Sequence, residues 1–236
     1  MRLLELFSGT GSIGKAFRAR GHEVVALDID KKSGADIVAD ILTWDFTDPA
    51  LGKFDMVWAS PVCTHYSIAR RSGGPPNLEW ADSLVNRTLE IISFFMLRGC
   101  KLFMFENPHS GLLKTRAMVL GIPFHVVDYC QYSGFKYRKR TALWSNITTF
   151  KPRRCDKNTC HAVIAGTARH AESAQDRVQK ITMRHAETAQ TWGSAKFASE
   201  TDRVIPRKEL YVIPPELCED ICIAAEEQLR SFTPQD

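Results

Sequence analysis

Short apolar runs alternate with glycine- and proline-rich turns through the first 145 residues of the chain. Each run has the length of a buried strand, and segments with apolar residues at helical spacing lie between them. Strands are predicted at residues 3–7, 23–28, 35–41, 56–59, 102–105 and 124–130. Helices are predicted at residues 12–20, 80–98, 111–120 and 215–232. Strands that alternate with helices predict an α/β fold around a parallel sheet.

The pattern loosens between residues 151 and 207, where long apolar side chains are few. Two near-copies, RHAESAQ at 169–175 and RHAETAQ at 184–190, lie within this segment. Two copies are too few for a solenoid. We therefore predict three parts of the chain: a main domain at 1–148, a small irregular lobe at 149–208, and a C-terminal segment at 209–236 whose helix returns to the main domain.

Composition changes this picture little. The 236 residues can bury one good core, and 44% hydrophobic with 25% charged residues is ordinary for a soluble globular protein. The formal charge of +4 permits a polyanionic partner without requiring one. Seven irregularly spaced cysteines favour a reducing compartment, the cytoplasm or the nucleus. No apolar stretch suits a membrane span or a secretion signal, so we expect neither membrane association nor secretion.

A glycine-rich turn follows the first predicted strand. Gly9, Gly11 and Gly14 satisfy the spacing G-x-G-x-x-G between a strand and a helix, and Asp28 stands at the tip of the next strand. An acid at that position is placed to bind ribose hydroxyls. The arrangement predicts a nucleoside-containing cofactor, and it leaves both NAD and S-adenosylmethionine open.

Two further strands deliver reactive side chains to their carboxyl ends. The apolar run at 56–59 stops at Ser60-Pro61, and Cys63 follows in the loop. Glu106 stands directly after the strand at 102–105. Taken singly, such a cysteine is more often inert and such an acid more often a solvated cap. In an open α/β sheet, however, ligands bind at the carboxyl ends of the strands, where both residues are expected to lie.

Two basic stretches and a cysteine–histidine group complete the candidates. Lys136, Arg138 and Arg140 share one face if their segment is extended, although an exposed basic strand explains them equally well. The segment 70–76, with two arginines and two glycines, suits either a lid or a solvated loop. Cys155, Cys160 and His161, with His170 or His185 as a fourth ligand, are candidate zinc ligands. Because their spacing is irregular and no second C-x-x-C pair exists, we predict no resident metal.

In combination, these motifs resemble the C5-cytosine DNA methyltransferase family, and they occur in the family's order over residues 1–145. The cofactor motifs are matched by Phe7, Ser8, Gly9, Thr10 and Gly11, then by the ribose-binding Asp28 with Ile29, and then by the adenine-contacting Asp40 and Ile41. The nucleophile motif is similar to residues 60–67, which include Pro61 and Cys63. The Glu-Asn-Val signature is similar to residues 106–108, and the end of Gln-x-Arg-x-Arg is similar to residues 138–140.

The resemblance implies a Rossmann-like class I methyltransferase sheet with a small recognition lobe, S-adenosylmethionine as cofactor and DNA as substrate. It implies that Cys63 adds to carbon 6 of a flipped-out cytosine and that Glu106 protonates or hydrogen-bonds N3. Arg138 and Arg140 would hold the base and lower the pKa of the thiol. One branch of the family methylates tRNA, so RNA stays open as a substrate. The sequence does not predict the oligomeric state.

Several positions depart from the family's pattern. Val62 stands where many members have proline, Thr64 replaces glutamine, Lys136 stands at the first position of Gln-x-Arg-x-Arg, and Pro108 replaces valine. The final Gly-Asn-Ser-Val motif is not found, and residues 213–217 occupy its region. A catalytically silent DNA-binding protein of the same fold and an NAD-dependent oxidoreductase are therefore alternatives. The first leaves Cys63 and Glu106 without use, and the second gives them no joint role.

Overall fold

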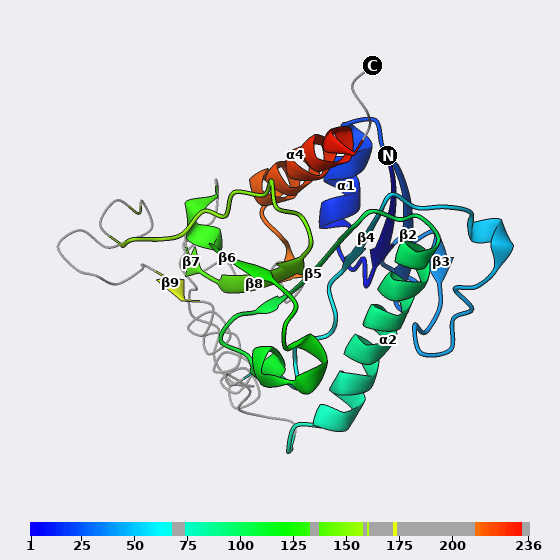
Figure 1. Cartoon of the computed structure of the whole chain (residues 1–236). Helices are drawn as coiled ribbons and strands as arrows, with labels where there is room; N and C mark the ends of the chain where they lie inside the picture. Colours follow the sequence, from blue (N-terminus) through cyan, green and yellow to red (C-terminus); the bar gives the residue numbers. More distant parts are fainter. Residues whose placement is uncertain (68–73, 133–136, 158–159, 161–171, 174–210, 233–236) are drawn as a thin grey trace, which may run out of the picture.

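In the computed structural model, the residues described are 1–67, 74–132, 137–157, 160, 172–173 and 211–232. They form one seven-stranded sheet in the order β3-β2-β1-β4-β5-β8-β6 (Figure 1). Its strands are β1 (Arg2–Leu6), β2 (Glu23–Asp28), β3 (Ile37–Val38), β4 (Met56–Ala59), β5 (Leu102–Pro108), β6 (Phe124–Asp128) and β8 (Arg140–Ser145). A two-stranded pair, β7 (Tyr137–Arg138) with β9 (Glu172–Ser173), lies beside it.

The strands from β3 to β5 run parallel, and β8 runs antiparallel to both of its neighbours, β5 and β6. The connections from β1 to β2 and from β4 to β5 each contain a helix, as βαβ units require. The strand order reverses between β1 and β4, which is the position where open α/β sheets bind their ligands. This topology confirms the predicted α/β, Rossmann-like methyltransferase fold.

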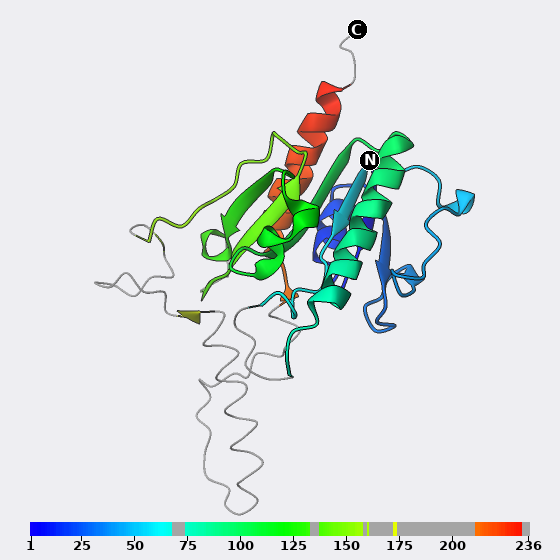
Figure 2. The same cartoon turned by 60° about the horizontal axis from the view of Figure 1, so that its bottom comes forward.

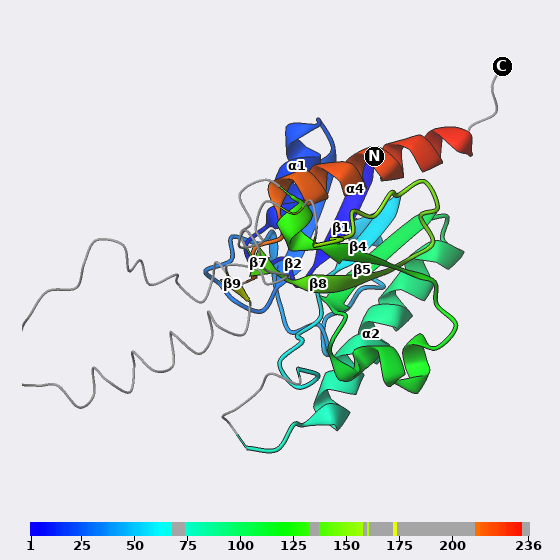
Figure 3. The same cartoon turned by 90° about the vertical axis from the view of Figure 1, so that its left-hand side faces the viewer.

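Three helices of the described part of the chain cover the two faces of the sheet. Helices α1 (Ser12–Ala19) and α4 (Pro215–Ser231) lie on one face, and α2 (Leu78–Leu97) lies on the other (Figures 2 and 3). The core is accordingly divided: Leu3 belongs to the apolar cluster under α1 and α4, whereas Leu4 belongs to the cluster under α2. Consecutive strand residues point to opposite faces, so β1, which is buried from Leu3 to Leu6, supplies both clusters.

Capping residues explain where the helices begin. The side chain of Asn77 accepts a hydrogen bond from the backbone N–H of Trp80 at 2.9 Å, so α2 begins at Leu78, two positions before the predicted start. Pro215 occupies the first turn of α4, where a missing N–H costs nothing. No helix among the described residues is long and apolar enough to cross a bilayer.

Three predicted elements are shorter than expected. The predicted helix at 111–120 is two 3-10 turns, η2 (Leu112–Thr115) and η3 (Ala117–Val119), because the extended backbone of Arg116 separates them. The predicted strand at 35–41 pairs with β2 only over β3. Before β3, the Asp36 carboxylate and not a strand backbone accepts the hydrogen bond from Ala26 N of β2, at 2.8 Å. The strand predicted at 124–130 ends at Asp128, and a 3-10 turn, η4 (Tyr129–Gln131), follows. A further 3-10 turn, η1 (Pro49–Leu51), precedes β4.

Helix α4 brings the end of the chain back to its beginning, because it packs beside α1 (Figure 1). Arg20, just after α1, makes two hydrogen bonds to the Glu226 carboxylate, at 2.8 and 2.9 Å. Of the lobe predicted at 149–208, only 149–157, 160 and 172–173 are among the described residues. The division of the chain at residues 148 and 208 therefore stays a prediction.

Candidate active site

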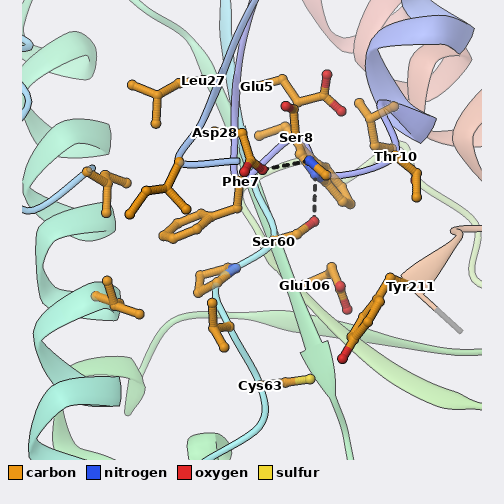
Figure 4. A pocket seen from close by; sticks show the side chains of 18 of the residues that line it. Glu5, Phe7, Ser8, Thr10, Leu27, Asp28, Ser60, Cys63, Glu106 and Tyr211 are labelled. Atoms are coloured by element: carbon orange, nitrogen blue, oxygen red, sulfur yellow. Dashed lines mark hydrogen bonds between the residues drawn. The ribbon is translucent and has the colours of Figure 1, made fainter. Parts of the chain in front are cut away.

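A cavity of about 420 Å³ opens at the carboxyl ends of β1, β2 and β4, where the strand order reverses. Figure 4 shows side chains from the glycine turn and β2 on one side of it, and Cys63 with Glu106 on the other. The residues predicted for the site that line it are Phe7, Ser8, Gly9, Thr10, Asp28, Ile29, Asp40, Ile41, Pro61, Cys63 and Glu106. Three predicted residues, Gly11, Arg138 and Arg140, are not among its lining residues.

The glycine turn has an unusual backbone. Gly9 and Gly11 have φ values of 50° and 65°, and Phe7, which is not glycine, has a φ of 56°. This left-handed conformation is rare for an aromatic residue and is found mostly at functional sites. Gly11 caps the start of α1, so its contribution is to the turn and not to the cavity wall. A Cβ at Gly14 would collide with the carboxylate of Glu5, which explains the third glycine of the motif.

Asp28 closes the turn from the end of β2. Its carboxylate accepts hydrogen bonds from the backbone N–H groups of Gly9 and Asp30, each at 2.8 Å. Each oxygen keeps lone pairs for a further donor. The next side chain, Ile29, is 68% exposed, an unusual fraction for a large apolar residue beside a cavity. Asp28 and Ile29 together offer a polar acceptor next to an apolar surface.

Glu5 is a site residue that the motifs did not predict. It lines the cavity from β1, is 2% exposed, and accepts a hydrogen bond from Gly14 N at 3.1 Å through Oε1. Its Oε2 has no hydrogen-bond partner among the described residues. Burial raises the pKa of Glu5 to about 7, although the Gly14 hydrogen bond and Arg18 act in the opposite direction. A charged residue inside the apolar run of β1 was the signal in the sequence that pointed to it.

The Cys63 loop is fixed by a residue of the Glu-Asn-Pro motif. Asn107 is 1% exposed, and its Nδ2 donates a hydrogen bond to the backbone oxygen of Pro61 at 2.9 Å. The indole of Trp58 donates to Ser60 Oγ at 3.1 Å, which holds the start of the same loop. Cys63 itself is partly buried. Its position therefore depends on hydrogen bonds from β4 and β5.

Burial and Lys139 act on the ionisation of both Cys63 and Glu106. Burial raises the pKa of the Cys63 thiol, Lys139 lowers it, and Glu106 raises it again. Burial also raises the pKa of Glu106, and Lys139 opposes this effect. Glu106 Oε2 is buried and has no hydrogen-bond partner among the described residues. The site therefore combines a thiol, a carboxyl that favours its protonated form, and one ammonium group that acts on both.

The arginines of the basic strand do not lie where we expected them. Arg138 and Arg140 share a face, as predicted, but that face meets Asp128 and not the cavity. Arg140 makes two hydrogen bonds to the fully buried Asp128 carboxylate, at 2.8 and 2.9 Å. Burial alone would raise the pKa of Asp128, but Arg140, the Cys155 N–H and Arg138 hold it below its usual range. The buried carboxylate decides which face of the strand turns inward.

Lys139 lines the cavity in their place. Side chains alternate along an extended strand, so turning Arg138 and Arg140 toward Asp128 turns Lys139 toward Cys63 and Glu106. Its Nζ lies 4.9 Å from the centre of the Tyr129 ring, and its backbone oxygen accepts the N–H of Tyr129 at 3.1 Å. In the sequence, Arg138 and Arg140 stand on one face of this segment and Lys139 on the other. The family motif favoured the face with the two arginines.

Several predicted residues lie outside the described ones: Arg70, Arg71 and Gly73 of the candidate lid, Lys136, and the candidate ligands His161, His170 and His185. Cys155 and Cys160 are described and lie away from the cavity.

Comparison with known proteins identifies the family. No protein-family profile matches the chain. A probable DNA (cytosine-5)-methyltransferase of Frog virus 3 (isolate Goorha) is 39% identical over 174 residues, which cover 68% of this chain and 78% of the viral protein. The chain belongs to the cytosine-5 methyltransferase family.

Solved structures similar to the chain include three methyltransferases. Dnmt2 of S. pombe matches with a TM-score of 0.43 and 14% identity over 83% of this chain, which spans 57% of the length of that protein. A Spodoptera frugiperda DNMT2 mutant matches with a TM-score of 0.44 and 12% identity over 98% of this chain and 99% of the other. The Entamoeba histolytica methyltransferase EhMeth matches with a TM-score of 0.49 and 10% identity over 97% of this chain and 98% of the other.

The cavity suits S-adenosylmethionine, the methyl donor implied for a member of this family. That cofactor has ribose hydroxyls, an adenine ring, and positive charge on its sulfonium and amino groups. Asp28 has lone pairs for the hydroxyls, and exposed Ile29 offers an apolar surface for a ring. Glu5 supplies a buried carboxyl oxygen without a described partner, as a site for a cationic group requires. The lining residues therefore fit the cofactor chemically.

Proposed function

We propose that this protein transfers a methyl group from S-adenosylmethionine to carbon 5 of cytosine in DNA. The observation that carries the proposal is a single cavity that has a nucleoside-type cofactor site at one end and Cys63, Glu106 and Lys139 at the other. DNA is favoured as the substrate because the viral relative is named for a DNA methyltransferase. An NAD-dependent oxidoreductase would give no role to a thiol beside a protonated carboxyl.

Cys63 is the proposed nucleophile. Carbon 5 of cytosine is too weak a nucleophile to accept a methyl group directly, so a thiolate first adds to carbon 6 and moves an electron pair toward carbon 5. In the resting site the raised pKa of Cys63 keeps the thiol protonated. Its proton must therefore pass to solvent water as the base arrives, and the nearby ammonium of Lys139 stabilises the thiolate that forms.

Glu106 is the proposed acid. When the thiolate adds to carbon 6, negative charge develops on N3 of the ring. Burial raises the pKa of Glu106 and so favours its protonated form, and a protonated carboxyl can donate a hydrogen bond or a proton to N3. An ionised carboxylate in the same place would repel that charge.

Lys139 is the proposed cation of the site, in place of Arg138 and Arg140. It acts on Cys63 and Glu106 together, whereas Arg138 and Arg140 are paired with Asp128. A lysine ammonium can hold the thiolate and also donate to the carbonyl oxygen of the target base.

The cofactor is proposed to lie against the glycine turn. Asp28 would accept the ribose hydroxyls, Ile29 and Ile41 would contact the adenine, and Phe7 and Pro61 would flank the methionine part. When bound, the cofactor supplies an electrophilic methyl group. Because carbon 6 is inaccessible within a duplex, the target cytosine must be flipped out, and the segment 149–208 is proposed to contact the surrounding nucleic acid.

The decisive experiment traps the protein on an oligonucleotide that contains 5-fluorocytosine, with S-adenosylmethionine present. Fluorine blocks the last step, the loss of the hydrogen from carbon 5, so the covalent complex persists. Wild-type protein and Cys100→Ser, which alters a buried cysteine outside the cavity, should both form the adduct, while Cys63→Ala should form none. A wild-type protein that forms no adduct with any substrate would refute the mechanism. An adduct on RNA alone would refute the proposed substrate and keep the chemistry.

A further inference from the structure

Three cysteines from separate parts of the chain meet beside the sheet. Cys130 lies in the 3-10 turn η4 that follows β6, and Cys155 and Cys160 lie in the segment after β8. Their sulfur atoms are all within 4.8 Å of one another. Cys130 and Cys160 are buried and Cys155 is partly buried, and none of the three is in a disulfide. The group lies outside the cavity, so the proposed reaction does not explain it.

The spacing suits a tetrahedral metal. With zinc–sulfur bonds of about 2.3 Å, the sulfurs of a tetrahedral site lie roughly 3.8 Å apart. Sulfurs within 4.8 Å of one another therefore need only a small side-chain movement to reach it. Two hydrogen bonds that involve these sulfurs are long: Cys160 Sγ lies 4.0 Å from Cys130 O, and Gln131 Nε2 lies 4.0 Å from Cys130 Sγ.

The surroundings can balance the charge of such a site. Burial, followed by the neighbouring thiols, raises the pKa of Cys130, so thiolates at this position need a nearby cation. Arg140 lies close enough for Cys130 and Cys155 to affect its pKa. The backbone N–H of Cys155 donates to the Asp128 carboxylate at 3.0 Å, which fixes the position of one ligand. Three arginines, Arg138, Arg140 and Arg154, face the single Asp128 carboxylate, so positive charge remains beside the cysteines. Together with a bound dication, it would compensate the negative charge of three thiolates.

A second group of possible metal ligands differs from the cysteine group, because one of its ligands is already paired. His22, Cys222 and Glu226 also bring ligand atoms within 4.8 Å of one another. There, however, Arg20 binds the Glu226 carboxylate with two hydrogen bonds and lowers its pKa to about 2. An arginine therefore already occupies the carboxylate that a metal would need. The cysteine group contains no carboxylate that is neutralised in this way, and its ligand atoms are three soft sulfurs.

We propose that Cys130, Cys155 and Cys160 bind a structural Zn²⁺ ion. Three soft thiolates, with a water molecule as the fourth ligand of a tetrahedral site, select zinc among the common divalent metals. The prediction of no resident metal rested on the spacing of Cys155 and Cys160, to which the fold adds Cys130. His161 lies outside the described residues and is not part of the proposed site.

The ion would join the segment after β8 to the sheet close to the active site. The backbone N–H of Asp128 donates to Arg153 O, and that of Tyr129 donates to Lys139 O, each at 3.1 Å. Cys130 is the next residue after these two. Zinc at this point would therefore hold in place both the strand that carries Lys139 and the start of the segment 149–208.

Metal analysis of the full chain tests the proposal without DNA or cofactor, so its outcome is independent of the methyltransferase proposal. Protein purified under reducing conditions from zinc-supplemented medium should contain about one zinc per chain by elemental mass spectrometry. Cobalt substitution should give the sulfur-to-cobalt charge-transfer and visible bands of a tetrahedral thiolate site. Cys155→Ser should lose the zinc and these bands, and Cys100→Ser, a buried cysteine elsewhere, should keep both.

Cys155 is the first position to change because it is only partly buried, so its serine variant is the one best tolerated by the fold. Cys130→Ser and Cys160→Ser should lose the metal as well, and circular dichroism would show whether each variant is folded. Wild-type protein with free thiols that binds neither zinc nor cobalt would overturn the proposal. So would a disulfide between two of the three cysteines, or zinc retained by folded Cys155→Ser.

Discussion

The assignment of Lys139 instead of Arg140 is the sharpest test of the active-site geometry. The two residues are neighbours in the chain, yet one lines the cavity and the other binds Asp128. Replacing each by methionine keeps most of the side-chain volume and removes the charge. Lys139→Met should therefore lower the rate of adduct formation, whereas Arg140→Met should lower the free energy of unfolding.

For Lys139→Met, two effects combine. Losing the ammonium raises the pKa of Cys63, and a rise of one unit lowers the thiolate fraction about tenfold near neutral pH. Losing a donor to the developing charge costs about a further 10- to 100-fold, somewhat less than a buried oxyanion-hole donor. The adduct rate should fall roughly 100- to 1,000-fold. The free energy of unfolding should change little, because the side chain stands at a cavity.

Arg140→Met should mainly lower the free energy of unfolding. Asp128 is fully buried, and removing one partner of a buried ion pair costs about 3 kcal/mol or more. Arg138 at 3.5 Å and Arg154 at 3.7 Å still face the carboxylate, so we expect the lower end of that range. The double variant Asp128→Asn/Arg140→Met removes the unpaired charge and should recover most of the stability.

The assays are single-turnover adduct formation, urea unfolding, and the pH dependence of Cys63 alkylation followed by peptide mass spectrometry. In Lys139→Met the alkylation midpoint should move to higher pH, while in the double variant it should stay near that of wild type. If the double variant were folded but formed no adduct, and Lys139→Met reacted at the wild-type rate, the arginine and not the lysine would be the active-site cation. The strand would then face the other way when substrate binds.

Two further predictions concern residues behind the cavity. Glu5→Gln should raise the free energy of unfolding above pH 7 by roughly 3 kcal/mol and leave it unchanged below pH 4. The reason is that burial raises the pKa of Glu5 to about 7, so ionisation of the carboxyl destabilises the fold progressively as the pH rises. The same change should weaken S-adenosylmethionine binding in calorimetry, and equal affinity would argue against Glu5 as a cofactor ligand. Asn107→Ala should lower stability by about 1–3 kcal/mol by leaving Pro61 O unpaired, and should also slow adduct formation at least tenfold. Asn146→Ala, which removes hydrogen bonds to Phe103 and Lys101, is the control: an equal loss of rate there would mean that the Asn107 effect is one of stability only.

The cofactor side of the site could be predicted from sequence because its parts are local. The turn around Gly9 and Gly11 connects one strand directly to one helix, and Asp28 lies at the tip of the following strand. Cofactor binding needs the left-handed backbone of the glycine turn and the carboxylate of Asp28, and both can be inferred from a short stretch of sequence. Glu5 was missed since its significance comes from burial under α1, which no local pattern specifies.

The catalytic end was predicted in part. Cys63 follows β4, and Glu106 lies in the carboxyl-terminal half of β5. The two strands are parallel neighbours, so the meeting of these residues at one edge followed from the α/β pattern. The alternation of Arg138, Lys139 and Arg140 could also be inferred from sequence. Which of the two faces turns inward could not, because it depends on Asp128, a residue of β6 that pairs with Arg140 only when β8 runs antiparallel beside it.

The sequence by itself predicted most of the strands and helices, the glycine turn, and Cys63 and Glu106 as the candidate thiol and acid, since hydrophobic periodicity and turn residues act over a few positions. The tertiary structure alone decided the reversal of β8, the inward face of Lys139 and the meeting of Cys130 with Cys155 and Cys160. These features depend on contacts between distant segments. The burial of one carboxylate or the approach of three sulfurs is a property of the packed chain, and no spacing along the sequence encodes it.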